Sequence, residues 1–208
     1  MGIKERRERE RQELRQRILA VARELAGQEG WQAVTIRKVA ERVEYSPPTI
    51  YEHFASKEAI LLELIRDGYG MLLADMQCAT AALSDPQERV LGLAQAYWEF
   101  AWQHPELYQV MHGLGGVPFC SDTAAIEAAG SPLLEADAVF DFTLAALSSL
   151  APQPGCTPGD LESAVMILWA LLHGLVALTM ADRVFGGREH AEQLLERAVR
   201  GFLRIFET

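Results

Sequence analysis

The segment from residue 35 to residue 60, TIRKVAERVEYSPPTIYEHFASKEAI, constrains the fold more than any other stretch of this chain. Thr35 is a favourable N-cap, and Ser46 can cap a second helix with Pro47 at its first position, where a missing backbone N–H is tolerated. Between the caps, apolar residues recur at helical spacing: Ile36, Val39, Ala40 and Val43. Two short helices joined by a tight turn predict a helix-turn-helix, whose commonest use is to enter a DNA major groove.

The rest of the chain also has helical periodicity, and no segment alternates as a strand does. We predict an all-α fold of about nine helices (an order-of-magnitude count from this periodicity). An N-terminal arm and three-helix bundle should occupy residues 1–55, and a C-terminal helical domain residues 56–208. Asp85-Pro86 predicts a helix start, whereas the Gly- and Pro-rich stretches 113–132 and 151–160 predict loops.

Charge divides unevenly along the chain. Residues 1–60 hold 12 Lys and Arg against 10 Asp and Glu, a balance of +2, and residues 61–208 hold 7 against 19, a balance of −12, which together give the net charge of −10. A DNA-binding surface needs local rather than global positive charge, so the division favours a nucleic-acid partner for the N-terminal segment.

The cysteine pattern and the N-terminus both favour the cytoplasm. The three cysteines, Cys78, Cys120 and Cys156, are odd in number and widely spaced, which suits a reducing compartment, and no role is predicted for them. The N-terminus, MGIKERRERERQ, is charged and lacks the apolar core of a secretory signal.

One run, residues 163–181, carries no acidic or basic side chain apart from His173 and approaches the length of a membrane span. His173 and Gly174 lie at its centre and charged residues flank it, so we expect a buried helix of a helical domain or dimer interface and no membrane partner.

The last predicted helix, about 188–206, carries a seam of apolar residues at alternating spacings of four and three: Ala191, Leu195, Ala198, Phe202 and Ile205. Such a seam packs lengthwise on another helix, either of the same chain or of a second subunit. We favour a homodimer through the helices at about 158–181 and 188–206, because a helix-turn-helix usually needs two half-sites. The alternating charges of residues 4–17 predict a solvated helix or frayed arm, with a DNA-contacting arm as the alternative.

Residues 17–62 resemble the DNA-binding domain of the TetR family of transcriptional regulators. The resemblance is carried by an ordered series: Gly30-Trp31, the Thr35 cap, Ile36 to Ala40, a turn ending in Ser46, Thr49 to Phe54, and Ser56-Lys57-Glu58. In the C-terminal region, Trp169 to Gly174 resembles the Trp…His-Gly element of the WHG-type TetR C-terminal domain.

Chemistry and this resemblance together indicate a DNA-binding set: Thr35, Arg37, Tyr45, Ser46, Pro47, Pro48, Thr49, Tyr51, His53 and Lys57. Arg37 is the expected base contact, because its guanidinium can bond guanine O6 and N7 together. The resemblance implies phosphate or groove contacts for Tyr51 and His53, and a phosphate anchor at Lys57. We expect a recognition helix over 46–54. Glu44 stands where the family usually has Gly, so a wider turn is expected, with Tyr45 reaching the DNA.

Aromatic residues on the later helices could line a mostly apolar effector pocket: Trp98, Trp102, Tyr108, His112, Phe140, Trp169 and His173. Nearby carboxylates leave room for a cationic or amphiphilic ligand. We find no catalytic set, metal-ligand spacing or cofactor motif, and therefore expect a non-enzyme without metal or cofactor.

The predicted function is a ligand-responsive regulator, most often a repressor in the resembled family, that leaves a double-stranded DNA operator when a small molecule binds. Two alternatives stay open: a helical ligand-binding protein or enzyme with a non-functional helix-turn-helix, and a helical protein–protein adaptor.

Overall fold

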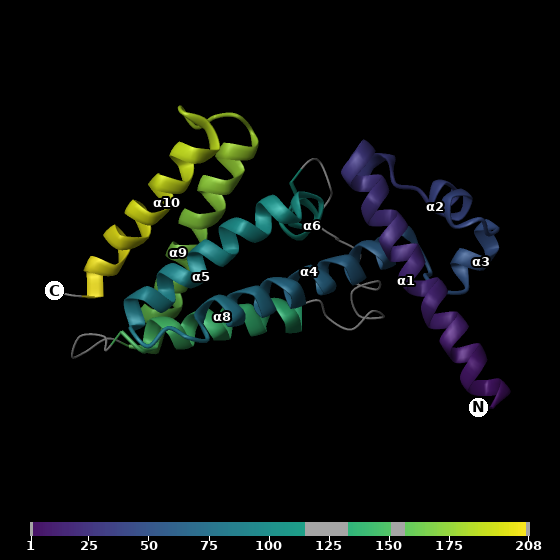
Figure 1. Cartoon of the computed structure of the whole chain (residues 1–208), viewed down its shortest axis with the longest axis horizontal. Helices are drawn as coiled ribbons and strands as arrows, with labels where there is room; N and C mark the ends of the chain where they lie inside the picture. Colours follow the sequence, from purple (N-terminus) through teal and green to yellow (C-terminus); the bar gives the residue numbers. More distant parts are fainter. Residues whose placement is uncertain (1, 115–132, 151–156, 207–208) are drawn as a thin grey trace. The chain divides into compact units, whose positions relative to one another are not determined.

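The structure, a computed structural model of the chain, describes residues 2–114, 133–150 and 157–206. Nine α-helices and two 3-10 turns occur in these ranges, and no strand does, so the predicted all-α class is confirmed (Figure 1). The elements are α1 (Ile3–Glu29), η1 (Trp31–Ala33), α2 (Ile36–Val43), α3 (Pro47–Tyr51), α4 (Lys57–Thr80), α5 (Pro86–Gln103), α6 (Pro105–Met111), α8 (Leu133–Ser148), α9 (Pro158–Met180), α10 (Gly187–Leu203) and η2 (Arg204–Phe206).

The chain forms two compact units. The N-terminal unit comprises Met1–Gly68 and His104–Leu133, and the C-terminal unit comprises Tyr69–Gln103 and Leu134–Thr208. The division falls inside α4, and α6 belongs with the helix-turn-helix although it follows α5 in the sequence. The boundary between residues 55 and 56 stays a prediction. Most of the predicted loops 113–132 and 151–160, together with Cys120 and Cys156, lies outside the described residues.

The N-terminal unit has its core where the apolar faces of α1, α2 and α3 meet. Figure 1 shows α2 and α3 lying beside α1. The core residues are Ile18, Ala22 and Leu25 of α1, Val39, Ala40 and Val43 of α2, and Ile50 of α3, followed by Phe54. The helical spacing of the apolar residues therefore predicts correctly which face of α2 is buried.

Local capping signals fix several helix ends. Asp85 Oδ1 accepts hydrogen bonds from the backbone N–H groups of Gln87 (2.7 Å) and Glu88 (3.1 Å), so the predicted start of α5 is confirmed. At the start of α9, Thr157 Oγ1 accepts from the Asp160 N–H while the Asp160 carboxylate accepts from the Thr157 N–H, which is a capping box.

In the C-terminal unit, α10 packs against both α5 and α9. Ala191, Leu195 and Phe202 of the apolar seam are buried in this packing within the single chain. Of the two alternatives, packing within the same chain is therefore the one that these three residues adopt. Ala198 of the seam is only half-buried and lines an apolar groove, so the dimer contact stays a prediction.

Helix α9 is only partly buried within the chain. Val165, Leu168 and Leu172 face the interior, whereas Met166 and Ile167 are 57% and 55% exposed. By length and composition alone, α9 is the one helix in the described ranges that could cross a membrane. The criterion is weak, because core helices of soluble proteins also satisfy it. The expected complete burial thus does not occur inside one chain, and an apolar strip of α9 stays uncovered.

Candidate DNA-binding site

The turn between α2 and α3 consists of Glu44, Tyr45 and Ser46. Glu44 adopts the left-handed conformation, with φ of 63° and ψ of 37°. Its N–H donates to the Glu41 carbonyl (3.2 Å) and the Tyr45 N–H donates to the Ala40 carbonyl (3.0 Å), which together form a Schellman motif. The predicted widening of this turn was wrong, because Glu44 accepts the left-handed conformation that glycine would normally supply.

Two adjacent prolines change how α3 begins. Ser46 occupies the N-cap position as predicted, but its side chain caps no backbone N–H. Pro48 has no N–H to donate, and the Thr49 N–H donates to the Ser46 carbonyl at 3.0 Å. The Ser46 hydroxyl instead pairs with the Thr49 hydroxyl at 3.0 Å. The α-helix ends at Tyr51, so it is shorter than the predicted 46–54, and His53 lies in the turn that follows.

Several predicted DNA contacts form an exposed surface around this turn. Tyr45 is 47% exposed and Tyr51 is 54% exposed, large values for aromatic side chains in a folded protein. Pro47 and Pro48 are exposed as well, and Thr49 is half-buried beside them. More than half of the Tyr51 side chain is thus open to solvent and available to a ligand surface.

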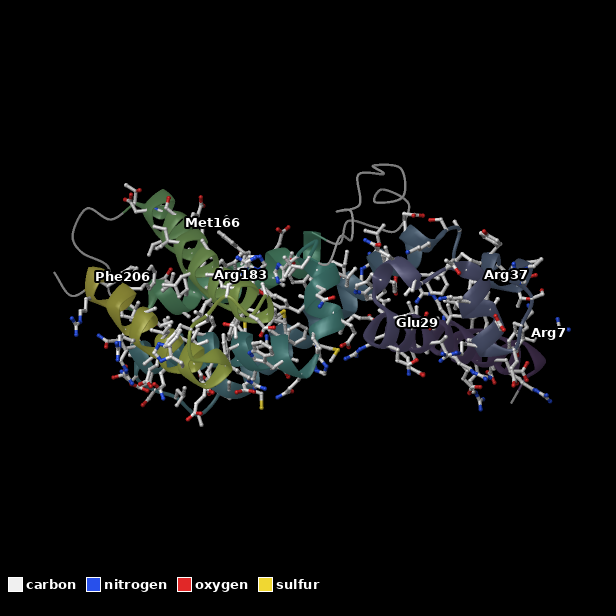
Figure 2. The ribbon with its side chains drawn as sticks, turned by 90° about the horizontal axis from the view of Figure 1, so that it is seen from above. Arg7, Glu29, Arg37, Met166, Arg183 and Phe206 are labelled. Atoms are coloured by element: carbon white, nitrogen blue, oxygen red, sulfur yellow. The ribbon has the colours of Figure 1, made fainter. Side chains whose placement is uncertain are left out.

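Ion pairs distinguish the three basic side chains of α2. Lys38 Nζ lies 2.7 Å from Glu29 Oε2, which lowers the pKa of that carboxyl, and Arg42 Nη1 lies 3.1 Å from Glu24 Oε1. Arg37 is exposed and has no ion pair among the described residues. Figure 2 shows Arg37 toward the same end of the N-terminal unit as Arg7, with Glu29 farther from that end. Arg37 is thus the unpaired cation of this helix in the described ranges.

Thr35 confirms its predicted role as the cap of α2. Its Oγ1 accepts a hydrogen bond from the Lys38 N–H at 3.2 Å. The hydroxyl still has its own proton to donate, and it lies at a helix N-terminus, where partial positive charge favours a phosphate.

Lys57 and His53 are less accessible than the sequence suggests. Lys57 Nζ donates to the Trp31 carbonyl at 2.8 Å, and burial lowers the pKa of its ammonium group. Burial, followed by the charge of nearby Arg11, lowers the pKa of His53, and His53 Nδ1 has no hydrogen-bond partner in the described parts of the chain. Sequence reasoning missed the bond between Lys57 and Trp31, and Gly30-Trp31 gave no local signal for it.

The predicted arm is the first part of α1. Residues 4–13 are exposed and helical, and Arg6 pairs with Glu10 one turn later at 2.7 Å. Of the two structural alternatives, solvated helix and frayed arm, the structure has the helix. Contact of this segment with DNA stays a prediction.

Comparison with known families agrees with this geometry. The pattern described as "Bacterial regulatory proteins, tetR family" matches residues 18–64, and the pattern described as "Tetracyclin repressor-like, C-terminal domain" matches residues 90–202, more than half of the chain. The chain belongs to the TetR family. It is therefore a helix-turn-helix transcriptional regulator.

The relatives of this chain include both a transcriptional activator and a transcriptional repressor. The HTH-type transcriptional activator FasR of Mycolicibacterium smegmatis is 25% identical over 132 residues, which are 64% of this chain and 59% of that protein. The HTH-type transcriptional repressor KstR2 of Mycobacterium tuberculosis is 31% identical over 87 residues, 42% of this chain and 44% of that protein. The chain thus matches about half the length of these curated relatives.

The fold of this chain is similar over almost its whole length to a solved structure, that of a protein with unknown function from Rhodococcus sp. RHA1. It is 24% identical, covers 94% of this chain and 96% of its own, and has a TM-score of 0.74.

The TetR-family C-terminal region holds the aromatic residues predicted to line an effector pocket. In the C-terminal unit the rings of Trp98 and Trp102 lie 5.4 Å apart, and those of Phe140 and Trp169 lie 5.8 Å apart. His173 is half-buried, which lowers its pKa. The two cavities described in this unit are lined by other residues. The remaining predicted pair, Tyr108 and His112, belongs to the N-terminal unit, with ring centroids 4.5 Å apart.

Proposed function

We propose that this TetR-family chain is a cytoplasmic, ligand-responsive regulator that inserts α3 into the major groove of a double-stranded DNA operator. The observation that supports this most is the exposed surface around the Schellman turn, which carries Tyr45 and Tyr51, together with Arg37 at the start of α2, which has no ion pair among the described residues. Arg37 would bond a guanine edge, and Tyr45 and Tyr51 would contact phosphates or groove walls. Thr35 and Lys57 would bind phosphates at the starts of two helices. One N–H of the Lys57 ammonium group donates to the Trp31 carbonyl, and the other two would donate to the phosphate.

The operator-binding form is proposed to be a homodimer through α9 and α10, since one five-residue helix offers few base contacts and two half-sites multiply them. An apolar groove of about 410 Å³ supports this choice. Its lining residues are Leu171, Gly174, Leu175, Leu178, Leu194, Arg197 and Ala198. No atom lies within 4 Å of where a Cβ of residue 174 would be, so the groove is open at this glycine. The exposed Met166, which Figure 2 labels on α9, lies on the same helix.

The effector is proposed to be a small molecule of amphiphilic character held among the predicted aromatic residues of the C-terminal unit, which offer apolar rings and a few polar atoms. Trp98, Trp102 and Trp169 each have a buried indole N–H without a partner in the described part of the chain. Unpaired buried donors favour a ligand that brings hydrogen-bond acceptors. We propose repression, relieved when the effector favours a subunit arrangement that no longer fits the operator.

The experiment that tests this proposal is selection of bound fragments from a random DNA pool at several salt concentrations, repeated with a small-molecule library. Enrichment of a palindromic sequence whose affinity falls steeply with salt would support operator binding, because phosphate contacts release counterions. Failure to enrich any sequence would contradict the DNA-binding proposal and favour a ligand-binding protein, an enzyme, or an adaptor that captures a protein partner. Catalysis is not part of the proposed function.

A further inference from the structure

Helix α6 belongs to the N-terminal unit, although none of the residues predicted to contact DNA lies on it. Three elements of that unit contact α6: α1, η1 and the first part of α4. Specific hydrogen bonds and one close side-chain contact accompany the burial of Leu107, Tyr108, Val110 and Met111. They connect α6 to the residues that bracket the helix-turn-helix.

Trp31 is the centre of this arrangement. It is 3% exposed, and its Nε1–H donates to the backbone carbonyl of Glu106 in α6 at 2.8 Å. Its own carbonyl accepts from Lys57 Nζ at 2.8 Å. Trp31 precedes α2 and Lys57 begins α4, so this second bond joins the two ends of the helix-turn-helix. One residue therefore binds α6 and also closes the DNA-binding motif.

Arg23 makes a second connection from α1. Its Nε lies 2.5 Å from Glu106 Oε1, and its Nη2 lies 2.6 Å from His104 Nδ1. A guanidinium group can only donate, so His104 Nδ1 is the acceptor and the neutral ring carries its proton on Nε2. Arg23 and Glu106 are 30% and 14% exposed, so water screens this pair less than a surface ion pair.

Gly68 provides the third connection, from α4. A Cβ at this position would lie 2.5 Å from Met111 Sδ, so the Met111 side chain of α6 occupies the space that a side chain at residue 68 would need. Met111 is 2% exposed and fills the space. Helix α6 is thus bonded at its start to Arg23 and Trp31, and at its end the buried Met111 packs against Gly68.

We propose that Trp31 and Arg23 are positioning residues, which fasten α6 to both ends of the helix-turn-helix so that operator affinity depends on where α6 lies. This inference rests on the proposed operator binding, but it adds a route by which the rest of the chain controls it. A shift of α6 displaces Trp31 through its bond to Glu106. The bond between Trp31 and Lys57 passes this displacement to the segment before α2 and to the start of α4.

The test uses reciprocity: if α6 sets operator affinity, the operator must in turn stabilise α6. Amide hydrogen exchange is measured over Tyr108–Met111 in the full chain, with and without a DNA fragment selected as above. We expect the fragment to slow exchange there by about fivefold or more, the lower range of typical coupling. Trp31→Phe, which keeps a ring but removes the N–H, and Arg23→Met should both reduce this slowing and weaken fragment affinity.

Matched variants separate positioning from general loss of structure. Arg200→Met removes an arginine that pairs with Glu196 at 2.9 Å in the C-terminal unit, and it should leave both readouts unchanged. Arg23→Lys, which keeps the charge but can serve one partner at a time, should restore part of the effect. Thermal unfolding checks each variant. If Trp31→Phe fails to fold, Arg23→Met decides.

Two outcomes are distinguishable. If wild-type protein binds the fragment tightly but α6 exchanges at the same rate with and without it, the positioning role is overturned while operator binding stands. If no fragment is bound at all, the proposed function itself fails.

Discussion

Glu44 holds a backbone conformation that disfavours side chains, with φ of 63°. The left-handed region costs an L-residue about 1–2 kcal/mol, whereas glycine enters it freely but loses about 0.5–1 kcal/mol through greater freedom of the unfolded chain. We therefore expect Glu44→Gly to raise the free energy of unfolding by up to about 1 kcal/mol. Urea denaturation measures the change.

A glycine within α2 supplies the control for Glu44→Gly. Glu41 is exposed and lies inside α2, so Glu41→Gly should lower the free energy of unfolding by about 1 kcal/mol, since glycine disfavours helix interiors. Equal losses in the two variants would show that the turn does not require a left-handed residue.

Arg37 and Lys38 are neighbours on α2 with different surroundings, which makes them a matched pair. Arg37→Ala should weaken binding to the selected operator by about 1–3 kcal/mol and leave binding to scrambled DNA almost unchanged, because a base contact is lost. Lys38→Ala, which removes the ion pair with Glu29, should affect both DNAs alike. Fluorescence anisotropy with both DNAs measures the difference, and an equal loss for Arg37→Ala would contradict its role.

The imidazoles of His53 and His173 have pKa values lowered by burial. The unfolded chain therefore binds these protons at higher pH than the folded chain, so folding stability is complete above about pH 6.5 and falls as the pH drops below it. We expect urea denaturation to show lower stability at pH 5.5 than at pH 7.5. Each of His53→Gln and His173→Gln should reduce the size of this decrease; an unchanged decrease in both would contradict the assignment.

At the scale of the element, α4 contains two glycines, Gly68 and Gly70, whose surroundings differ. Gly68 makes room for Met111, whereas nothing lies within 4 Å of a Cβ at Gly70. Gly70→Ala should raise the free energy of unfolding by about 1 kcal/mol through helix propensity. Gly68→Ala should raise it by less, because the added methyl displaces the Met111 side chain and the cost of that shift offsets part of the gain in helix propensity. Denaturation of the two variants in parallel checks this, and equal effects would contradict the close contact between Gly68 and Met111.

The ends of elements were predictable from sequence where the signal is local. Thr35 and Asp85 cap helices through atoms two or three residues away, so their side chains alone indicate the boundary. The cap predicted at Ser46 failed for a local reason as well. Pro48 has no N–H to donate, and the Thr49 N–H bonds the Ser46 carbonyl instead of its hydroxyl.

Contacts between distant residues were not predictable in the same way. Arg23 and Glu106 are 83 positions apart, and Trp31 and Lys57 are 26 apart. Periodicity shows which face of a helix is apolar but not which neighbour covers it. The seam of α10 illustrates this limit, because Ala191, Leu195 and Phe202 are buried within the chain, where α10 packs against α5 and α9, whereas Ala198 lines the apolar groove.

At the scale of the whole molecule, the proposed dimer can be tested without disturbing the folded subunit. Leu178 is 52% exposed and lines the apolar groove, so a charge there does not enter the core of the monomer. We expect Leu178→Glu to yield monomers at micromolar concentration in sedimentation experiments and to weaken operator binding by more than about tenfold, as two half-sites become one.

The exposed Ala79 on α4 gives the matched control. Ala79→Glu introduces the same charge at a site that does not line the groove, and it should leave the sedimentation behaviour unchanged. Dimers of Leu178→Glu with full operator affinity would rule out this face as the subunit contact.

The four tryptophans are divided between the two units, so the intrinsic fluorescence of the protein can report on one unit at a time. Trp31 lies in the N-terminal unit with its indole bonded to Glu106. The other three belong to the C-terminal unit, and their N–H groups have no partner among the residues that the structure describes. A protein in which Phe replaces those three would emit from Trp31 alone. Its fluorescence would follow the DNA-binding half of the molecule in real time, without any attached dye.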